Sequence, residues 1–408
     1  MTDLVAPLDE ATGTVVTDRA VRRRVGWIWA LLFFNVLAYE KLPMLVPIPS
    51  ILGKALTQGS LWAAFLLALT VNRRGLFRSN AFLVLGTLLA ATSLIMSVRT
   101  LHVGSIYRAV RLIGFLATLW LLTPWWGRRD LMLTRFHVRC MVGVMISAMA
   151  GYLVAHHKAM ASGRLFGVIW PIPAPQLAHY SAVAVGLGIV LWFSGLLRRR
   201  QALALVGFGL VVLLLTHTRT ALVAMSIAVL VAALSLFVSN RRVRRALAGF
   251  ALIVVLVAIP FAPAISHWFV RGENTTTFSD LTGRTLVWHE LINLPRTNTQ
   301  VLLGSGLSNK SFQGLPIDDS WLAIYQDQGL VGDAIVALFM LALLLKAFIV
   351  PRGPAKSLAL FLIVYCLVAS YTEVGLGDAS TYILDLSIAG SLLMSPAWTR
   401  ITETVSTL

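Results

Sequence analysis

The sequence predicts an all-α, polytopic membrane protein, and its composition, its apolar runs and the placement of its basic residues all support that fold class. Of the 408 residues, 58% are hydrophobic and only 12% are charged, and the mean hydropathy is +0.80. These values exclude an ordinary soluble domain. Apolar runs of about 17 to 22 residues, each long enough to cross a hydrocarbon core of about 30 Å as a helix, recur along the chain.

About twelve such runs predict about twelve transmembrane helices, with no room between them for a soluble domain of ordinary size. The first run follows the basic cluster Arg22–Arg24. We expect it to be a span and not a signal peptide, because no small-residue cleavage site follows it. The expected helix centres lie near Leu32, Phe65, Leu89, Leu116, Val144, Gly186, Leu210, Val229, Val255, Leu338, Ile363 and Ile388.

The basic residues predict the orientation of the chain. With the amino terminus placed in the cytoplasm, about two thirds of the 34 Lys and Arg residues fall on cytoplasmic connections. The net charge of +17 therefore reflects topology and gives no support to nucleic-acid binding. The expected layout is a cytoplasmic tail at 1–24, nine spans in 25–265, a long extracytoplasmic loop at 266–320, three spans in 321–398, and a cytoplasmic tail at 399–408.

Two extracytoplasmic connections are longer than the rest, one near 156–175 and the other at 266–320, and we expect the chemistry there. Within the longer one, "LTGRTLVWHELINLP" predicts an amphipathic helix that begins after Thr282 and lies along the membrane surface. The stretch "PIDDSWLAIYQDQGLVG" then starts a further helix, and either Asp318 or Asp319 is expected to be its N-cap.

Arginines on the predicted outer face are candidates for binding an anion. Arg219 lies in the short turn "THTRTAL" between two apolar helices. Each arginine alone could be an interfacial residue whose side chain reaches toward water. Together they predict a basic outer cavity, and because guanidinium groups bind phosphate oxygens bidentately, pyrophosphate is the natural ligand. The set comprises Arg164, Arg219 and Arg284, with Arg99, Arg108 and Arg111 on the same face.

The carboxylates leave two interpretations open. Asp318 and Asp319 could serve only as helix caps, or one of them could accept a proton from an attacking sugar hydroxyl. Glu373, Asp378 and Asp385 are expected to pair with the arginines or to line the cavity. The histidines and the two cysteines, Cys140 and Cys366, lack metal-ligand spacing, so neither a metal site nor a disulfide is expected.

Four motifs resemble one family, the bacterial O-antigen ligases and Wzy-type polysaccharide polymerases, which are membrane glycosyltransferases related to the GT-C class. "LLGSGLSNKSFQGLPIDDSWLAIYQDQGLVG" is similar to the family's Gly-x-Gly, His-Asn-x-Tyr-Leu and Gly-hydrophobic-hydrophobic-Gly pattern. "SGRLFGVIWPIPAPQLAHYSA", "THTRTALVA" and "LTGRTLVW" are similar to its arginine motifs. The motifs cover about Arg164 to Gly332, and beyond them the resemblance rests on hydropathy.

The resemblance implies a GT-C-like fold and a donor glycan on polyprenyl pyrophosphate that is transferred to an acceptor hydroxyl outside the membrane. Arg164, Arg219 and Arg284 would then hold the pyrophosphate without a metal or other cofactor. Asp318 stands where the ligases carry the histidine that is their proposed base, and this substitution favours polymerisation. Catalytic candidates are Asp318 and Asp319, and further substrate-binding candidates are Arg99, Arg108, Arg111, His217, Arg271 and Trp321.

The leading hypothesis is therefore an inverting polysaccharide polymerase of the bacterial plasma membrane, with both termini in the cytoplasm and the active site outside. A ligase that transfers the glycan to a lipid, glycolipid or protein acceptor is the alternative. A flippase of lipid-linked sugars is a third hypothesis, which the lack of internal repeats disfavours. The expected partners are membrane lipids, the lipid-linked donor and the acceptor, with a chain-length regulator left open.

Overall fold

A computed structural model of the chain describes residues 19–40, 42–128, 131–161, 163–237, 243–245 and 284–394. Within these ranges the regular structure is helical, apart from a hairpin of two short strands, β1 Ser311–Phe312 and β2 Leu315–Pro316. The hairpin pairs Phe312 with Leu315 in antiparallel register. The predicted span centred near Val255, most of both predicted tails and the start of the long loop lie outside the described residues.

The helices follow one another through short connections, as the hydropathy pattern predicts. Those before the long loop are α1 Arg19–Asn35, α2 Ser50–Val71, α3 Ala81–Arg99, α4 Val103–Leu122, α5 Met132–Val154, α6 His156–Ala159, α7 Ala174–Phe193, α8 Arg199–Leu215 and α9 Arg219–Phe237. A 3-10 turn, Thr123–Trp125, extends α4. Those that follow are α12 Arg284–Asn293, α13 Asn298–Leu303, α14 Ser320–Ile349, α15 Pro354–Ala369 and α16 Thr381–Leu392.

Seven helices in the described part of the chain are long and apolar enough to cross a membrane, namely α2, α3, α4 with its 3-10 extension, α5, α7, α9 and α14. Two shorter apolar helices, α15 and α16, accompany them. The predicted centres Leu32 and Leu210 fall on α1 and α8, which have 17 residues each. A polytopic membrane protein is thus supported, whereas the count of twelve spans stays a prediction.

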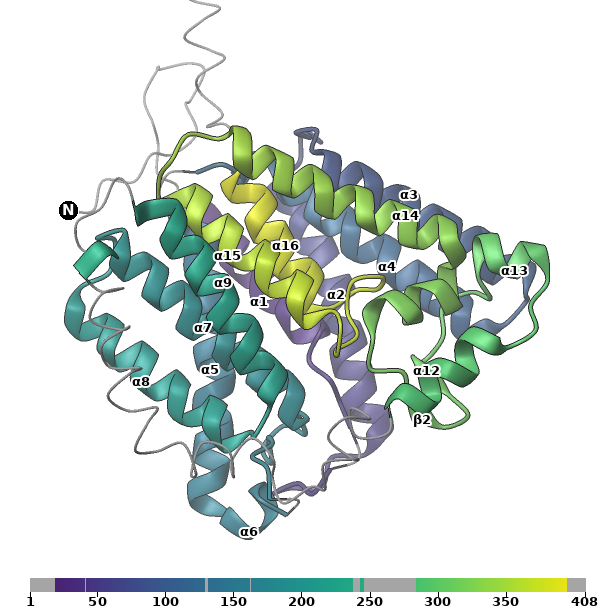
Figure 1. Ribbon diagram of the computed structural model, residues 1–408, viewed down its shortest axis with the longest axis horizontal. Coiled ribbons are helices and arrows are strands. Elements are labelled where there is room, and N and C mark those ends of the chain that lie inside the picture. The colour runs from purple at the N-terminus through teal and green to yellow at the C-terminus, as the bar shows by residue number, and fades with distance from the viewer. Residues whose placement is uncertain are drawn as a thin grey trace, which may run out of the picture.

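The helix bundle is organised around α15 and α16, which lie between two groups of helices in Figure 1. Helices α7, α8 and α9 lie on one side, and α3, α4 and α14 run together on the other. Helix α15 packs against α9, α7, α14 and α16. Helix α7 is more deeply buried than α2. In the most apolar 18-residue stretch of α7, 78% of the residues are buried, against 33% in that of α2.

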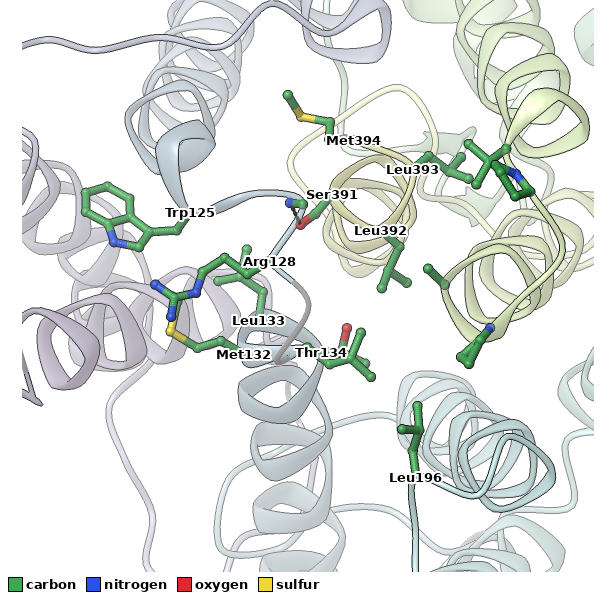
Figure 2. A pocket seen from close by; sticks show the side chains of 16 residues that line it. Trp125, Arg128, Met132, Leu133, Thr134, Leu196, Ser391, Leu392, Leu393 and Met394 are labelled. Atoms are coloured by element: carbon green, nitrogen blue, oxygen red, sulfur yellow. Dashed lines mark hydrogen bonds between the residues drawn. The ribbon is translucent and has the colours of Figure 1, made fainter. Parts of the chain in front are cut away.

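The short connections make successive helices reverse direction, so the bundle has two ends. We call the end at which α14 and α16 begin the loop end, because the described part of the long loop joins it. The opposite end, where α14 and α16 finish, is the far end. A cavity of about 430 Å³ lies at the far end, between the α4–α5 turn and the end of α16. Figure 2 shows Trp125, Arg128 and Leu392 around it.

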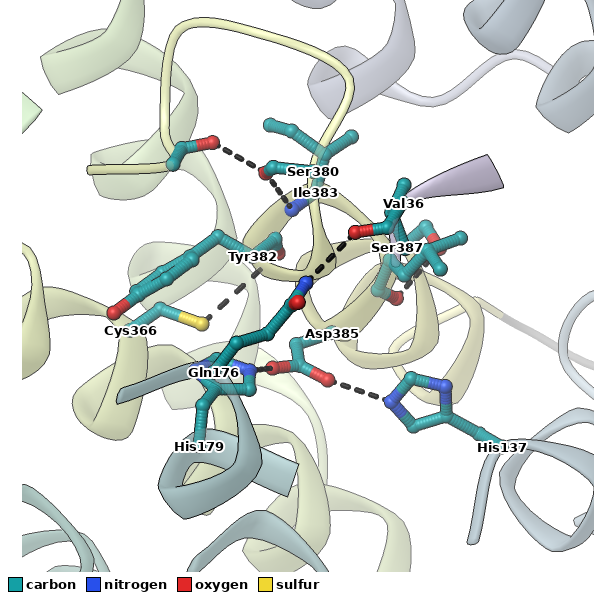
Figure 3. A network of polar contacts seen from close by, with 12 residues as sticks. Val36, His137, Gln176, His179, Cys366, Ser380, Tyr382, Ile383, Asp385 and Ser387 are labelled. Atoms are coloured by element: carbon teal, nitrogen blue, oxygen red, sulfur yellow. Dashed lines mark hydrogen bonds and ion pairs between the residues drawn. The ribbon is translucent and has the colours of Figure 1, made fainter. Parts of the chain in front are cut away.

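A buried polar network joins α16 to α5 and α7 (Figure 3), and a further hydrogen bond extends it to α1. The Asp385 carboxylate of α16 lies 2.6 Å from Nε2 of His137 on α5 and 2.7 Å from Nε2 of His179 on α7. Trp29 of α1 donates its indole N–H to Nδ1 of His137 at 3.3 Å. Asp385 and His137 are fully buried. Asp385 was expected to pair with arginines or to line the cavity, but the structure pairs it with two histidines. Because a buried carboxylate needs such partners, the network fixes α16 against α5 and α7.

We expect Asp385→Ala to destabilise the protein by about 3 kcal/mol, because it leaves two buried imidazoles without their shared partner. The thermal midpoint of the detergent-purified protein measures this loss. Ser387→Ala on the same helix is the matched control. The Ser387 side chain is also buried, but its hydroxyl bonds only to the carbonyl of Leu384 within α16. Equal midpoints for the two variants would contradict the prediction.

Candidate functional site

Two predicted phosphate-binding arginines are joined at the loop end by direct hydrogen bonds between their segments. Arg164 lies between α6 and α7, and Arg219 is the first residue of α9. The Arg164 guanidinium donates from Nε to the carbonyl of Thr216 and from Nη2 to Oγ1 of Thr218, both at 3.0 Å. Arg164 is thereby fixed beside the turn that precedes Arg219.

The third arginine, Arg284, begins α12 and reaches the same place through the packing of that helix. Trp288 of α12 donates its indole N–H to the carbonyl of Ile317 at 2.8 Å. Leu291 and Ile317 are fully buried in one small apolar cluster beneath this contact. As a result, Nε of Arg284 lies 3.2 Å from Oδ2 of Asp318, with 26% and 31% of the two side chains exposed.

The electrostatic environment of Arg164 shows that the three arginines form one cluster. Burial lowers the pKa of the Arg164 guanidinium, the charge of Glu373 opposes this, and the charges of Arg284 and Arg219 lower the pKa further. The charge of Asp318 acts in the opposite sense. Three guanidinium groups so close together form a basic cluster, which is an arrangement that favours an anion.

The two adjacent aspartates have different environments. Asp319 is buried and is the N-cap of α14, where its carboxylate accepts a hydrogen bond from the Leu322 backbone N–H at 2.8 Å. Burial raises the pKa of Asp319, and hydrogen bonds from the backbone of Leu322 and Trp321 oppose that rise. Asp318 instead has a left-handed backbone with φ of 47° and points toward Arg284. A non-glycine residue in that conformation is uncommon and often marks a functional turn.

Two further carboxylates accompany Asp318. Burial raises the pKa of Glu373 to about 7, the charge of Asp318 adds to the rise, and Arg284 and Arg164 oppose it. Partial desolvation, and then the charge of Asp318, raise the pKa of Glu40. The sequence interpretation included Glu373 as a partner of the arginines but missed Glu40. Its signal is an isolated acidic residue directly after the first apolar run, in "LAYEKLP". The cluster therefore contains charges of both signs.

The glycine motif builds a close crossing of two backbones beside this cluster. The backbone N–H groups of Ser305 and Gly306 donate to the carbonyls of Gln326 and Asp327 at 3.0 and 2.9 Å. At Gly329, where φ is 66°, the α14 backbone leaves helical geometry. A Cβ on Gly304 would lie 2.2 Å from the carbonyl carbon of Asp327, so no larger residue fits there.

The connection between α15 and α16, residues 370–380, is tied to the first residues of α14. The Ser320 backbone N–H donates to the carbonyl of Ser370 at 2.9 Å, and its hydroxyl donates to the carbonyl of Glu373 at 2.7 Å. The Trp321 indole N–H donates to Oγ of Ser370 at 3.1 Å. Ser320 and Trp321, which follow the aspartate pair in the sequence, thus hold the segment that carries Glu373.

The remaining predicted substrate-binding residues that the structure describes lie on several different helices and turns. The Arg111 guanidinium on α4 donates to Asn35 and to the carbonyl of Ala379 at 3.3 Å, so it joins the end of α1 to the 370–380 connection. Arg99 is exposed at the end of α3, and Arg108 is half-buried on α4. His217 has a φ of 49° in the turn before α9. Arg271 lies outside the described residues. In the part of the chain that the structure describes, no three His, Cys, Asp or Glu side chains are placed to hold a metal ion.

Residues 204–332 match a family model described as O-antigen ligase, Wzy_C. The match spans 129 of the 408 residues, so this part of the chain is similar to that family. This match confirms the resemblance that the motifs indicated, and it points to a membrane enzyme of the glycosyltransferase type. The matched segment contains Arg219, Arg284 and Asp318, whereas Arg164 precedes it. No curated protein matches the chain.

We expect Gly304→Ala to destabilise the protein by about 2 kcal/mol or more, because the new methyl group meets the α14 backbone and the residue keeps a positive φ. Gly314→Ala is the matched control. Its φ is also positive, at 83°, but no atom lies within 4 Å of the added Cβ. The difference in thermal midpoint between the two variants measures the crowding alone, and equal losses would contradict the prediction.

The raised pKa of Glu373 predicts a pH dependence of stability. The ordinary pKa of 4.5 applies to the unfolded chain, and the folded value is about 7. Between these values the folded protein binds more protons, so the contribution of Glu373 to stability falls as the pH rises through that window. Thermal midpoints at several pH values should show a steeper decline for the native protein than for Glu373→Gln. Glu290→Gln, at an exposed residue of α12, should leave the native slope unchanged.

Proposed function

We propose that this protein polymerises polysaccharide repeat units that are carried on polyprenyl pyrophosphate, by glycosyl transfer outside the plasma membrane. The observation that carries the proposal is the convergence of Arg164, Arg219 and Arg284 with Asp318 at one end of an apolar helix bundle. Charged groups are costly at such a position, so an arrangement that collects several of them favours a binding site for a charged headgroup.

The arginines would hold the pyrophosphate of the donor. Guanidinium groups match phosphate oxygens geometrically and stay charged under all physiological conditions. When the bond from the anomeric carbon to the pyrophosphate breaks, negative charge grows on the departing oxygen, and fixed positive groups stabilise it. In this proposal the guanidinium groups supply the charge stabilisation without a cofactor. Arg164 and Arg284 approach the site from separate segments, so they can contact opposite sides of one ligand.

The acceptor hydroxyl would attack from the face opposite the pyrophosphate and invert the anomeric configuration. Asp318 either accepts the hydroxyl proton or orients the acceptor, and Asp319 is the second candidate from the sequence. The Asp319 carboxylate is buried at the helix cap, which supports a structural role for it. The ion pair of Asp318 with Arg284 supports an orienting role for Asp318.

The orientation in the membrane is part of the proposal. Exposed basic residues lie at the far end, among them Arg73 and Arg74 after α2 and Arg352 after α14. Cytoplasmic connections are enriched in Lys and Arg. This distribution supports a cytoplasmic far end with both termini, and an extracytoplasmic loop end with the arginine cluster.

Transfer of the glycan to a different acceptor, such as a lipid, a glycolipid or a protein, is the second candidate function. The description of the matching family model as O-antigen ligase favours it. The replacement of the ligases' histidine by Asp318 favours the polymerase. A polymerase takes a second lipid-linked repeat unit as acceptor and could act with a chain-length regulator, whereas a ligase ends the chain.

We expect Arg219→Ala and Arg284→Ala each to lower the rate of transfer by about 10²- to 10³-fold, since each removes a group that stabilises the departing pyrophosphate. The measurement is glycan formation by the purified protein from lipid-linked repeat units. Arg352→Ala at the exposed far end should retain the native rate. Unchanged elongation in the Arg219 and Arg284 variants would refute the proposed site.

The size of the product separates the candidate functions. Incubation of the purified protein with a single lipid-linked repeat unit should give a ladder of products that differ by one repeat. A single transfer to an added acceptor lipid, without a ladder, would indicate a ligase. Movement of labelled lipid-linked sugar across vesicles without a new glycosidic bond would refute both and indicate a flippase.

A further inference from the structure

Glu373 lies among the charged groups of the candidate site, on a connection that many contacts hold in place. Asp318, Arg284 and Arg164 all act on it electrostatically. Its backbone carbonyl accepts the hydroxyl of Ser320 at 2.7 Å, and that hydroxyl accepts the N–H of Gly375 at 3.0 Å. Glu373 is half-buried.

The other end of the same connection is fixed as firmly. Gln328 of α14 donates to the carbonyl of Gly377 at 2.8 Å, and Arg111 donates to the carbonyl of Ala379 at 3.3 Å. The Tyr382 ring packs closely on Gly375: a Cβ added at Gly375 would lie 2.3 Å from Cδ2 of the ring. Residues from α4, α14 and α16 therefore determine where the Glu373 backbone lies, which is the support that a precisely placed reactive group needs.

The carboxylates of Asp318, Asp319 and Glu373 differ in the hydrogen bonds and ion pairs that they form. The Asp318 carboxylate pairs with the Arg284 guanidinium at 3.2 Å, so it already has a charged partner. Asp319 is bound to the start of α14. Among the described contacts, the Glu373 carboxylate has neither a hydrogen bond nor an ion pair of this kind, and it lies within electrostatic reach of both Arg164 and Arg284.

We propose that Glu373, and not Asp318, accepts the proton of the acceptor hydroxyl, and that Asp318 holds Arg284 in position for the pyrophosphate. This inference rests on the proposed glycosyl transfer. Burial and the Asp318 charge raise the pKa of Glu373 to about 7, so the group can take up and release a proton near neutral pH, as an efficient general base does.

The step balances with the groups already named. The acceptor oxygen forms a bond to the anomeric carbon, and the bond from that carbon to the pyrophosphate oxygen breaks. The electron pair of the broken bond stays on the pyrophosphate, where the arginines stabilise it. The hydroxyl proton moves to the Glu373 carboxylate and leaves to water after the products depart. Neither an oxidant nor a second substrate beyond donor and acceptor is required.

The charged groups around Glu373 raise or lower the pKa of its carboxyl group. Arg164 and Arg284 favour the carboxylate, whereas Asp318 disfavours it. Tyr365 of α15 and Tyr382 of α16 also lie within electrostatic reach. Arg219 interacts electrostatically with Arg164, and Glu40 interacts electrostatically with Asp318. Because the base must be ionised, the rate should rise with pH through an apparent pKa near 7.

The experiment compares Glu373→Gln with Asp318→Asn in the full-length purified protein, using lipid-linked repeat units as substrate. We expect Glu373→Gln to lower kcat by about 10²- to 10⁴-fold and to leave KM for the donor within about threefold. It should also remove the rise of kcat with pH. Asp318→Asn should mainly raise KM, because Arg284 loses the partner that orients it, and should keep the pH-dependent rise.

Glu290→Gln is the matched control, because it removes an exposed carboxylate of α12 on the same side of the bundle. It should retain the native kcat and pH profile. Glu373→Asp guards against a folding defect, since it keeps a carboxylate at this position. It should lower kcat less than Glu373→Gln does and should retain a pH-dependent rise.

The outcomes separate the two proposals. If the native protein forms glycosidic products and Glu373→Gln matches it in kcat and pH profile, Glu373 is not the base and the proposed function stands. If Asp318→Asn removes the pH-dependent rise while Glu373→Gln keeps it, Asp318 is the base and the inference is wrong. If the native protein forms no glycosidic product, the proposed function fails and the inference fails with it.

Discussion

The attachment of the 370–380 connection to the start of α14 is the constraint on which the candidate site depends. Ser320 makes three of the hydrogen bonds in this attachment, because its backbone N–H and its hydroxyl bond to Ser370, Glu373 and Gly375. The preceding residue, Asp319, begins the same helix as its cap. Asp318 therefore cannot move far from Glu373 without disrupting a helix start. The acidic side of the cluster is built from the backbone of two neighbouring connections, and the arginines meet it from α9, α12 and the segment before α7.

The molecule keeps two sets of charged groups apart. At the loop end, the Arg284 and Asp318 side chains form an ion pair that is partly exposed. Inside the bundle, Asp385 is fully buried and bonded to His137 and His179. A buried group of that kind contributes by fixing helices, because any change of partner would expose an uncompensated charge. A carboxylate thus has a structural role on α16, as Asp385, and a proposed chemical role in the connection before it, as Glu373.

The sequence predicted the class of fold and named all three arginines of the cluster, but it did not predict the different environments of the carboxylates. Apolar runs marked the helices because a membrane core selects length and hydropathy directly. The motifs around Arg219, Arg284 and Asp318 were visible because each is local. The environments of Asp318 and Asp319 are not local: one depends on Arg284, and the other on the geometry of a helix start. Glu40 lacked any motif, and only the packing of distant segments brings it near Asp318.

The sequence by itself indicated a polytopic helical membrane protein and showed motifs that resemble the O-antigen ligase family. Hydropathy and short-range spacing are properties of neighbouring residues, so the sequence alone reveals them. The tertiary structure alone decided that the Gly304 segment crosses the α14 backbone, that Ser320 holds Glu373, and that Asp385 pairs with histidines. Each of these depends on contacts between segments far apart in the chain, whose distances no local pattern encodes.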